Sequence, residues 1–265
     1  MKNLIRILYV SIFTVLAGLV FQSCSSVFDS GSYENYYVSF GTMDHSHTVP
    51  LVITDDNTHL YINEVGTLSS QEEVNTTTGR VFFNYSFLSN KITVDGESFY
   101  NIRLNRFYQL HTEDIKVLSQ MTPEEVENIG TDAVGVYQAS VGGGYVNINF
   151  CYTYNPVMAE TFVHDVDLIY DDVNFSDGRI HLLLRHKGDG STSTSYINYK
   201  TASFRLVAPL DSPENTGKTL VLDWSWYDDS GQRGTYTGSM NFSPFAGVLS
   251  SNNTVRDGEV PLRVH

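Results

Sequence analysis

Two groups of side chains in this sequence have the types and spacing that metal ions require. His45-Ser46-His47 would place two imidazoles on one face of a strand, a spacing that can chelate zinc or copper. A third ligand is not evident nearby, and an exposed loop without metal is the alternative. The second group is acidic and consists of Asp165, Asp167, Asp171 and Asp172. Carboxylates are calcium ligands, so these four are candidates for a loose calcium site, with an acidic turn as the alternative.

The residues after this acidic group do not complete an EF-hand. Asp172, Asn174 and Ser176 stand at the first three oxygen positions of such a loop. Asp177, however, occupies the position that needs glycine, and Leu183 stands where the bidentate glutamate belongs. The sequence therefore rejects an EF-hand, and we expect no cofactor.

Signatures of catalysis are missing from the sequence. There is no G-x-S-x-G elbow, H-E-x-x-H, P-loop or C-x-x-C. Carboxylates do occur as adjacent pairs, at Asp55-Asp56, Glu72-Glu73, Glu124-Glu125 and Asp228-Asp229. Neighbouring residues of a strand point to opposite faces, so these pairs cannot work together across a sugar as glycosidases require. We predict a protein that is not an enzyme. An unrecognised hydrolase is the exception, and it would need titratable groups from different strands converging in a deep pocket.

Three consecutive glycines, Gly142-Gly143-Gly144, are the remaining motif. Asn147 stands where a dinucleotide-binding fingerprint would need its third glycine, and no βαβ pattern surrounds the run. The glycines predict a tight hairpin or a bulge between two strands.

The start of the chain has the order of a secretory signal peptide. Lys2 and Arg6 precede the apolar stretch 7–21. That stretch has about 15 residues against the roughly 20 that a spanning helix needs. Ser23-Cys24 satisfies the last two positions of a bacterial lipobox, although Phe21 and Gln22 depart from its usual residues. We predict a signal peptide over 1–23, lipidation of Cys24 and a flexible spacer over 24–35. Ordinary cleavage near Ser23 and an uncleaved anchor are the alternatives.

If the thiol of Cys24 carries the lipid anchor, Cys151 is the single remaining free cysteine, so no internal disulfide can form. Cys151 lies between Phe150 and Tyr152 in a strand-like run. This setting predicts a buried, small, apolar side chain rather than a nucleophile.

Composition and charge favour an all-β protein that avoids nucleic acid. The chain has 17 Tyr and 15 Phe but only 16 Lys plus Arg, and its formal net charge is −14. Aromatic residues prefer half-buried pleated surfaces. An acidic surface repels phosphate backbones, so we expect no nucleic acid as a partner. Solubility alone is the alternative explanation of the acidity.

Strand-like runs fall into two groups separated by one short helix. The first group occupies 36–40, 48–54, 59–62, 80–88 and 99–107 and predicts a small closed barrel over 36–118. Thr122, Pro123 and Glu125 have the N-cap, first-turn and capping-box positions of a helix that ends at Gly130. This helix makes 119–130 the predicted linker.

The second group of strands predicts a β-sandwich over 131–265. Val146, Ile148 and Phe150 alternate with asparagines. Leu220, Leu222, Trp224 and Trp226 alternate in the same way, which directs both tryptophans inward. Six or seven such strands, separated by turn clusters, are typical of two packed sheets.

Several stretches resemble the NigD-like lipoproteins of Bacteroidota. They are RVFFNYSFLS (80–89), FYNIRLNRFYQLHTEDI (99–115), IGTDAVGVYQASVGGGYVNINFCY (129–152) and GRIHLLLRH (178–186). The resemblance implies an N-terminal OB-type barrel followed by a C-terminal β-sandwich, joined here by one short helix. It implies no catalytic residues, and the family's association with bacteriocin gene clusters implies an immunity role only as an alternative.

These observations together predict a non-catalytic lipoprotein of the cell envelope. We expect it to be held at a membrane by lipid, most simply the outer membrane, on either the periplasmic or the surface face. Its barrel or sandwich would bind a protein, peptide or glycan. Immunity against a bacteriocin and an unrecognised envelope hydrolase are the alternatives.

Overall fold

The computed structural model describes residues 36–94, 97–158, 162–228 and 230–243. All of these belong to one compact unit, Tyr36–His265. The predicted signal peptide, Cys24 and the spacer lie outside the described residues. No helix among the described residues is long and apolar enough to cross a membrane.

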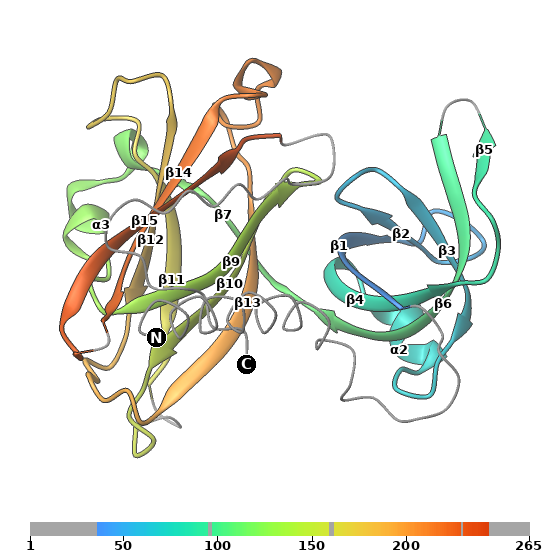
Figure 1. The fold of residues 1–265 in the computed structure, drawn as a ribbon, viewed down its shortest axis with the longest axis horizontal. Coiled ribbons are helices and arrows are strands. Elements are labelled where there is room, and N and C mark those ends of the chain that lie inside the picture. Colours follow the sequence, from blue (N-terminus) through green and yellow to red (C-terminus); the bar gives the residue numbers. More distant parts are fainter. Residues whose placement is uncertain (1–35, 95–96, 159–161, 229, 244–265) are drawn as a thin grey trace, which may run out of the picture. The chain divides into compact units, whose positions relative to one another are not determined.

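The N-terminal strands form the predicted barrel (Figure 1). They are β1 (Tyr37–Asp44), β2 (Leu51–Thr54), β3 (His59–Val65), β4 (Gly79–Phe87), β5 (Ile92–Val94) and β6 (Glu97–Gln109). Their order in the sheet is β3-β2-β1-β4-β6-β5, and a parallel pairing between β3 and β6 closes five of them into a ring. This is the arrangement of an OB-type barrel, and the prediction of that fold is confirmed.

A short helix, α2 (Gln71–Thr76), follows β3 and was not predicted. Ser70 accepts a hydrogen bond from the backbone N–H of Glu73, and the Glu73 carboxylate accepts one from the N–H of Ser70. This capping box stabilises the first turn, and Val74 is fully buried against the barrel core. The Ser-x-x-Glu spacing was the available sequence feature. It was missed because the helix is shorter than two turns and carries a single apolar residue.

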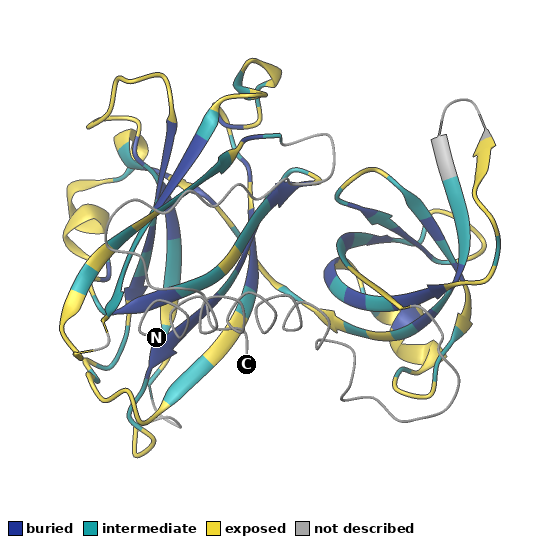
Figure 2. Cartoon of the chain, viewed as in Figure 1, coloured by how far each residue is buried: buried dark blue, intermediate teal, exposed yellow. Residues whose placement is uncertain are grey.

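The C-terminal strands form two packed sheets, as predicted. One sheet has the order β7 (His111–Asp114), β13 (Ile197–Arg205), β10 (Tyr145–Thr153) and β9 (Val134–Gly142). The other has the order β15 (Arg233–Asn241), β14 (Thr219–Tyr227), β12 (Ile180–Lys187), β11 (Asp165–Tyr170) and β8 (Lys116–Val117). Figure 2 shows buried residues on the strands of both sheets and exposed residues on the connections.

Period-2 alternation produces the sandwich core. Val146 and Ile148 are fully buried in it, and Trp224 packs against it. Trp226 instead lies against Gly135. A Cβ at position 135 would lie only 3.0 Å from the indole, so a larger residue there would crowd it. The inward apolar rows of the two sheets meet face to face, which removes them from water and stabilises the domain.

The boundary between the domains differs from the predicted one. The helix α3 (Pro123–Glu127) has its predicted capping box of Thr122 and Glu125 and follows a 3-10 turn, η2 (Leu118–Gln120). However, β7 and β8, which the prediction placed in the barrel at 36–118, pair in parallel with β13 and β11 of the sandwich. The sandwich therefore begins at His111. Neither strand is long enough to have a recognisable pattern of its own. Their partners, β13 and β11, lie far along the chain, so the sequence did not indicate which sheet they join.

Candidate functional site

The outer face of the four-stranded sheet carries a row of polar side chains. On β10, Val146 and Ile148 point into the core, so Asn147 and Asn149 point outward. Opposite them on β13, Ser203 pairs with Asn147 and Thr201 pairs with Asn149. A polar row on a rigid sheet can position hydrogen-bonding groups for a ligand or for another part of the chain.

At one end of this face the polar row is buried beneath the barrel. The Arg80 side chain is 1% exposed and donates to both carboxylate oxygens of Asp55, at 2.6 and 3.0 Å. Arg80 also donates to Asn147 Oδ1 at 2.8 Å, and Asn147 Nδ2 donates to Asp55 Oδ2 at 2.7 Å. Ser203 Oγ completes the network with a 2.7 Å bond to Asn147 Oδ1. The buried charge of Arg80 is thus paired, and the network joins barrel to sandwich.

The glycine run makes this close approach possible. Gly143 and Gly144 have φ of +57° and +83°, which confirms the predicted tight hairpin, here between β9 and β10. A Cβ on Gly143 would lie 2.6 Å from Asp55 Oδ1, and one on Gly142 would lie 2.7 Å from Asp55 Cβ. The run therefore serves the turn and also the contact with Asp55.

A hollow of about 360 Å³ lies beside this network. Its charged lining groups are Asp55 and Arg80, which are already paired with each other. The hollow therefore offers neither a free acid nor a free base to a substrate.

The other end of the polar face is open and forms a second hollow of about 330 Å³. It is lined by Tyr137, Asn149, Phe150, Tyr199, Lys200 and Thr201. Asn149 Nδ2 donates to Gln138 Oε1 at 3.2 Å, and Thr201 Oγ1 donates to Asn149 Oδ1 at 2.8 Å. The rings of Tyr137 and Tyr199 lie 5.4 Å apart, and Tyr199 is 64% exposed. The hollow thus combines an exposed aromatic surface with an ordered row of amides and a hydroxyl.

Tyr137, which lines this hollow, and its hydrogen-bond partner Cys151 both stay protonated. Tyr137 Oη donates to Cys151 Sγ at 3.2 Å. Burial raises the pKa of Tyr137, and the bond to Cys151 raises it further. Burial also raises the pKa of the Cys151 thiol. Cys151 is buried as predicted, and its thiol is held away from the thiolate form that a nucleophile needs.

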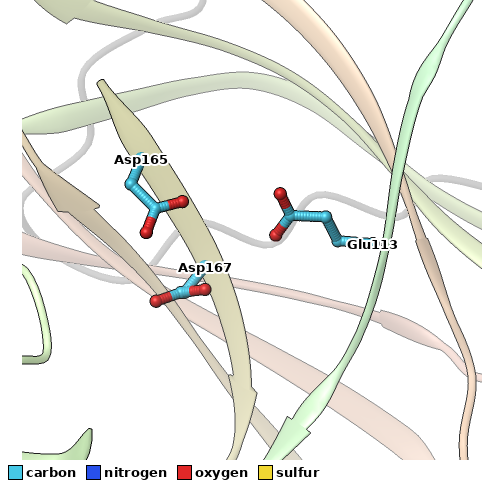
Figure 3. A group of neighbouring side chains, drawn as sticks. All are labelled: Glu113, Asp165 and Asp167. Carbon is cyan, nitrogen blue, oxygen red and sulfur yellow. The ribbon is translucent and has the colours of Figure 1, made fainter. Parts of the chain in front are cut away.

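Two of the four predicted calcium ligands meet, with a partner that the prediction did not name. Asp165, Asp167 and Glu113 have carboxylate oxygens within 4.8 Å of one another, and Figure 3 shows their side chains converging from β11 and β7. Lys116 Nζ, however, already contacts Asp167 Oδ1 at 2.5 Å. An ammonium inside the group supplies the positive charge that a cation would otherwise supply.

The other two predicted ligands have separate structural roles. Asp171 accepts from the backbone N–H of Val173 and from Asn174, which closes the turn after β11. Asp172 accepts from the backbone N–H of Ser119. The predicted set of four aspartates is therefore not brought together.

The predicted histidine pair lies in a bend rather than on a strand. His45 Nε2 bonds to the Thr77 carbonyl at 2.7 Å, whereas the ring of His47 packs edge-on against Tyr61. The two imidazoles are thus used separately, which matches the loop alternative.

Sequence reasoning did not single out Tyr137, Gln138 or Tyr199. Along β13, Ala202 and Phe204 point into the core, and Tyr199 and Thr201 stand at the alternate positions. This period-2 pattern could have indicated that Tyr199 and Thr201 point outward. The contact between Thr201 and Asn149 could not be predicted from a local pattern, because the two residues are 52 positions apart in sequence and meet only through the register of β10 and β13.

Comparison with known proteins identifies the C-terminal fold. The sequence pattern of the NigD-like C-terminal beta sandwich domain matches residues 117–237. No curated protein is significantly similar to the chain.

Three solved structures share the fold at low sequence identity. A protein of unknown function from Bacteroides vulgatus has a TM-score of 0.58 and 22% identity, and the match covers 86% of this chain and 97% of that one. A protein described as toxin-related from Parabacteroides distasonis has a TM-score of 0.54 and 19% identity over 79% and 96% of the two chains. A protein described as a lipoprotein from Bacteroides fragilis has a TM-score of 0.51 and 9% identity over 79% and 99%. At these identities the likeness concerns the fold alone.

Proposed function

We propose that this chain, whose residues 117–237 match the NigD-like C-terminal beta sandwich domain, is a lipid-anchored, non-catalytic binding protein of the cell envelope. Its ligand would occupy the open hollow on the outer face of β9, β10 and β13. Bacteriocin immunity and an unrecognised hydrolase activity stay alternatives from the sequence, and no feature of the described residues favours either of them.

The composition of the open hollow carries this proposal. Tyrosine and asparagine side chains give large contact area and adaptable hydrogen bonds at low entropic cost. The residues around Asn149 are already fixed by the sheet and by their mutual hydrogen bonds, so little conformational entropy would be lost on binding. Neither of the two hollows described above has converging free acids and bases, which hydrolytic chemistry would require.

The location in the envelope rests on the sequence around Cys24. The order of charged, apolar and small residues before it is that of a lipoprotein signal. We place the protein at the outer membrane. Acyl chains on one cysteine suffice to hold a soluble domain at a bilayer, since each buried methylene contributes about 0.8 kcal/mol.

Capture of the ligand would test the binding function. The lipidated protein, extracted with detergent, would be incubated with envelope extract and recovered together with anything bound. We expect a reproducible bound component that is lost in Tyr199→Ala and retained in Tyr108→Ala, a matched exposed tyrosine of the barrel. Recovery of nothing, or equal recovery by both variants, would overturn the assignment of the hollow.

Protease treatment of intact cells would place the protein on one face of the membrane. Degradation by external protease means that the binding face is displayed at the surface. Survival until the outer membrane is opened means that it faces the periplasm. Either result selects the compartment in which the ligand must be sought.

A further inference from the structure

We propose that the open hollow binds a neutral oligosaccharide, with a sugar ring stacked on Tyr199 and its hydroxyls bonded to the row Gln138, Asn149 and Thr201. This rests on the proposed binding function and names the chemical class of the ligand. The hollow has three properties that point to this class: an exposed aromatic ring, unused hydrogen-bonding groups of both kinds and a lining without carboxylates.

Tyr199 supplies the stacking surface. It is 64% exposed, so a face of its ring is open to a ligand. Tyr137 packs beside it at 5.4 Å and is itself anchored by the 3.2 Å bond to Cys151 Sγ. The face of an aromatic ring is electron-rich and attracts the weakly positive C–H groups on the flat side of a pyranose. Because Tyr137 already restricts the ring of Tyr199, stacking costs little side-chain entropy.

The amide row supplies the hydrogen bonds. Gln138 uses its Oε1 to accept from Asn149, and Asn149 uses its Oδ1 to accept from Thr201. Gln138 Nε2 keeps two donors, Asn149 Nδ2 keeps one, and Thr201 Oγ1 keeps acceptor capacity within the described chain. A sugar hydroxyl both donates and accepts, so adjacent hydroxyls can satisfy both kinds of group. A purely anionic or purely cationic ligand cannot.

Charge favours a neutral ligand. The chain as a whole has a formal net charge of −14, yet the described lining of this hollow contains no carboxylate and one cation, Lys200. A polyanion would meet repulsion from the acidic molecule at every approach outside the hollow. A polycation would find no carboxylate within it. A neutral oligosaccharide is not repelled by the acidic surface and needs no carboxylate as a partner.

Size and position favour a small ligand over a folded protein. The hollow has six lining residues, whereas a stable protein interface engages roughly 20 to 30 residues on each partner. The same polar face continues toward Asn147, but there the barrel residues Asp55 and Arg80 occupy its hydrogen-bonding groups. The open site is therefore a short stretch that ends at this contact, which suits a few sugar units.

Calorimetric titration of the detergent-extracted lipidated protein would test this. The probes are cellotetraose, maltotetraose, mannotetraose and xylotetraose, with tetra-alanine as a peptide of similar length. We expect at least one tetrasaccharide to bind with a Kd of about 1 mM or tighter. Tyr199→Ala should weaken that binding about tenfold, whereas Tyr199→Phe keeps the ring and should stay close to the parent. Thr201→Val should also weaken it, and Tyr108→Ala should leave it unchanged.

Absence of binding by all four tetrasaccharides would overturn the proposal, as would binding that Tyr199→Ala leaves intact. Binding of tetra-alanine alone would assign the hollow to peptides instead. The capture experiment separates these failures from failure of the binding function. A captured component that depends on Tyr199, in a protein that ignores all four sugars, refutes the glycan class and keeps the site.

Discussion

The buried His186 and the half-buried His164 form a hydrogen-bonded pair whose protons can be assigned from their partners. His186 Nδ1 lies 3.1 Å from the Ala133 carbonyl, which can only accept, so this nitrogen carries a proton. In the neutral ring Nε2 then accepts from His164 Nδ1 at 3.0 Å. His164 Nε2 is left as a buried acceptor without a hydrogen-bond partner in the described chain, 3.8 Å from the Asp189 carboxylate.

Burial lowers the pKa of both imidazoles, and the nearby carboxylates of Asp132 and Asp189 oppose this only in part. Tyr152 stacks on the two rings at 4.5 and 4.7 Å and keeps water from them. Folding therefore favours the neutral forms. Below about pH 6.5 the unfolded chain binds protons that the folded chain does not, so the free energy of unfolding must fall as pH falls.

The pair should make stability depend on pH between 7.5 and 5.5. We expect the midpoint of thermal unfolding to drop over this interval, and to drop less in His164→Phe, which keeps the stacking on Tyr152 but cannot be protonated. His111→Gln is the control, since the His111 side chain is 69% exposed. Unfolding curves measured at a series of pH values would show it. An equal pH dependence in His164→Phe would contradict the role of the pair.

Cys151 should react slowly with thiol reagents. Its side chain is buried, and burial raises the pKa of its thiol, so little thiolate is exposed at neutral pH. We expect a disulfide reagent such as 5,5′-dithiobis(2-nitrobenzoic acid) to modify it at least about a hundredfold faster in denaturant than in the folded state. Rapid modification of the folded protein would contradict the burial of the thiol.

At the scale of elements, the glycines of the β9–β10 hairpin have two roles: they form the tight turn, and they allow the barrel residue Asp55 to approach it. Gly144 needs only its positive φ, since a Cβ there would meet nothing within 4 Å. Gly143 needs positive φ and also the absence of a Cβ beside Asp55. Substituting each of these two glycines therefore measures two different free-energy costs: that of the left-handed backbone alone at Gly144, and that of the backbone plus the contact with Asp55 at Gly143.

Alanine substitutions should show this difference. Gly144→Ala should destabilise the protein by about 1 kcal/mol, the cost of the left-handed backbone for an L residue. Gly143→Ala adds a clash with a carboxylate that Arg80 holds in place, and should cost about 3 kcal/mol. Urea unfolding of both variants would measure the two values. Equal losses would mean that Asp55 moves away freely.

The sequence was a good guide to elements that carry their own pattern. The alternation of Val146, Ile148 and Phe150 and the capping box at Thr122 are local properties, and both gave the observed strand and helix. It was a poor guide to short elements. The strand β8 has two residues, and α2 has one buried residue, Val74, so neither repeats a pattern often enough to be recognised.

At the scale of the whole molecule, the proposed attachment to the membrane would depend on Cys24. Replacing Cys24 by serine should abolish incorporation of labelled palmitate and move the protein from the membrane fraction to the soluble one. Cys151→Ala is the matched control and should keep both the label and the location. Labelling of cells followed by fractionation measures both properties. A labelled Cys24→Ser protein would contradict lipidation at this position.

The sequence by itself predicted the all-β class and the division into barrel and sandwich, because both follow from alternating patterns within contiguous residues. The export signal stays a prediction from the sequence. Only the tertiary structure decided which part of the polar face is covered by the barrel and which part stays open. Asn147 and Asn149 are two residues apart and equivalent in pattern, yet Asn147 bonds to Asp55, 92 residues away, and Asn149 faces the open hollow. Such a distinction depends on where the barrel covers the sheet and on strand register between distant segments, which no local pattern records.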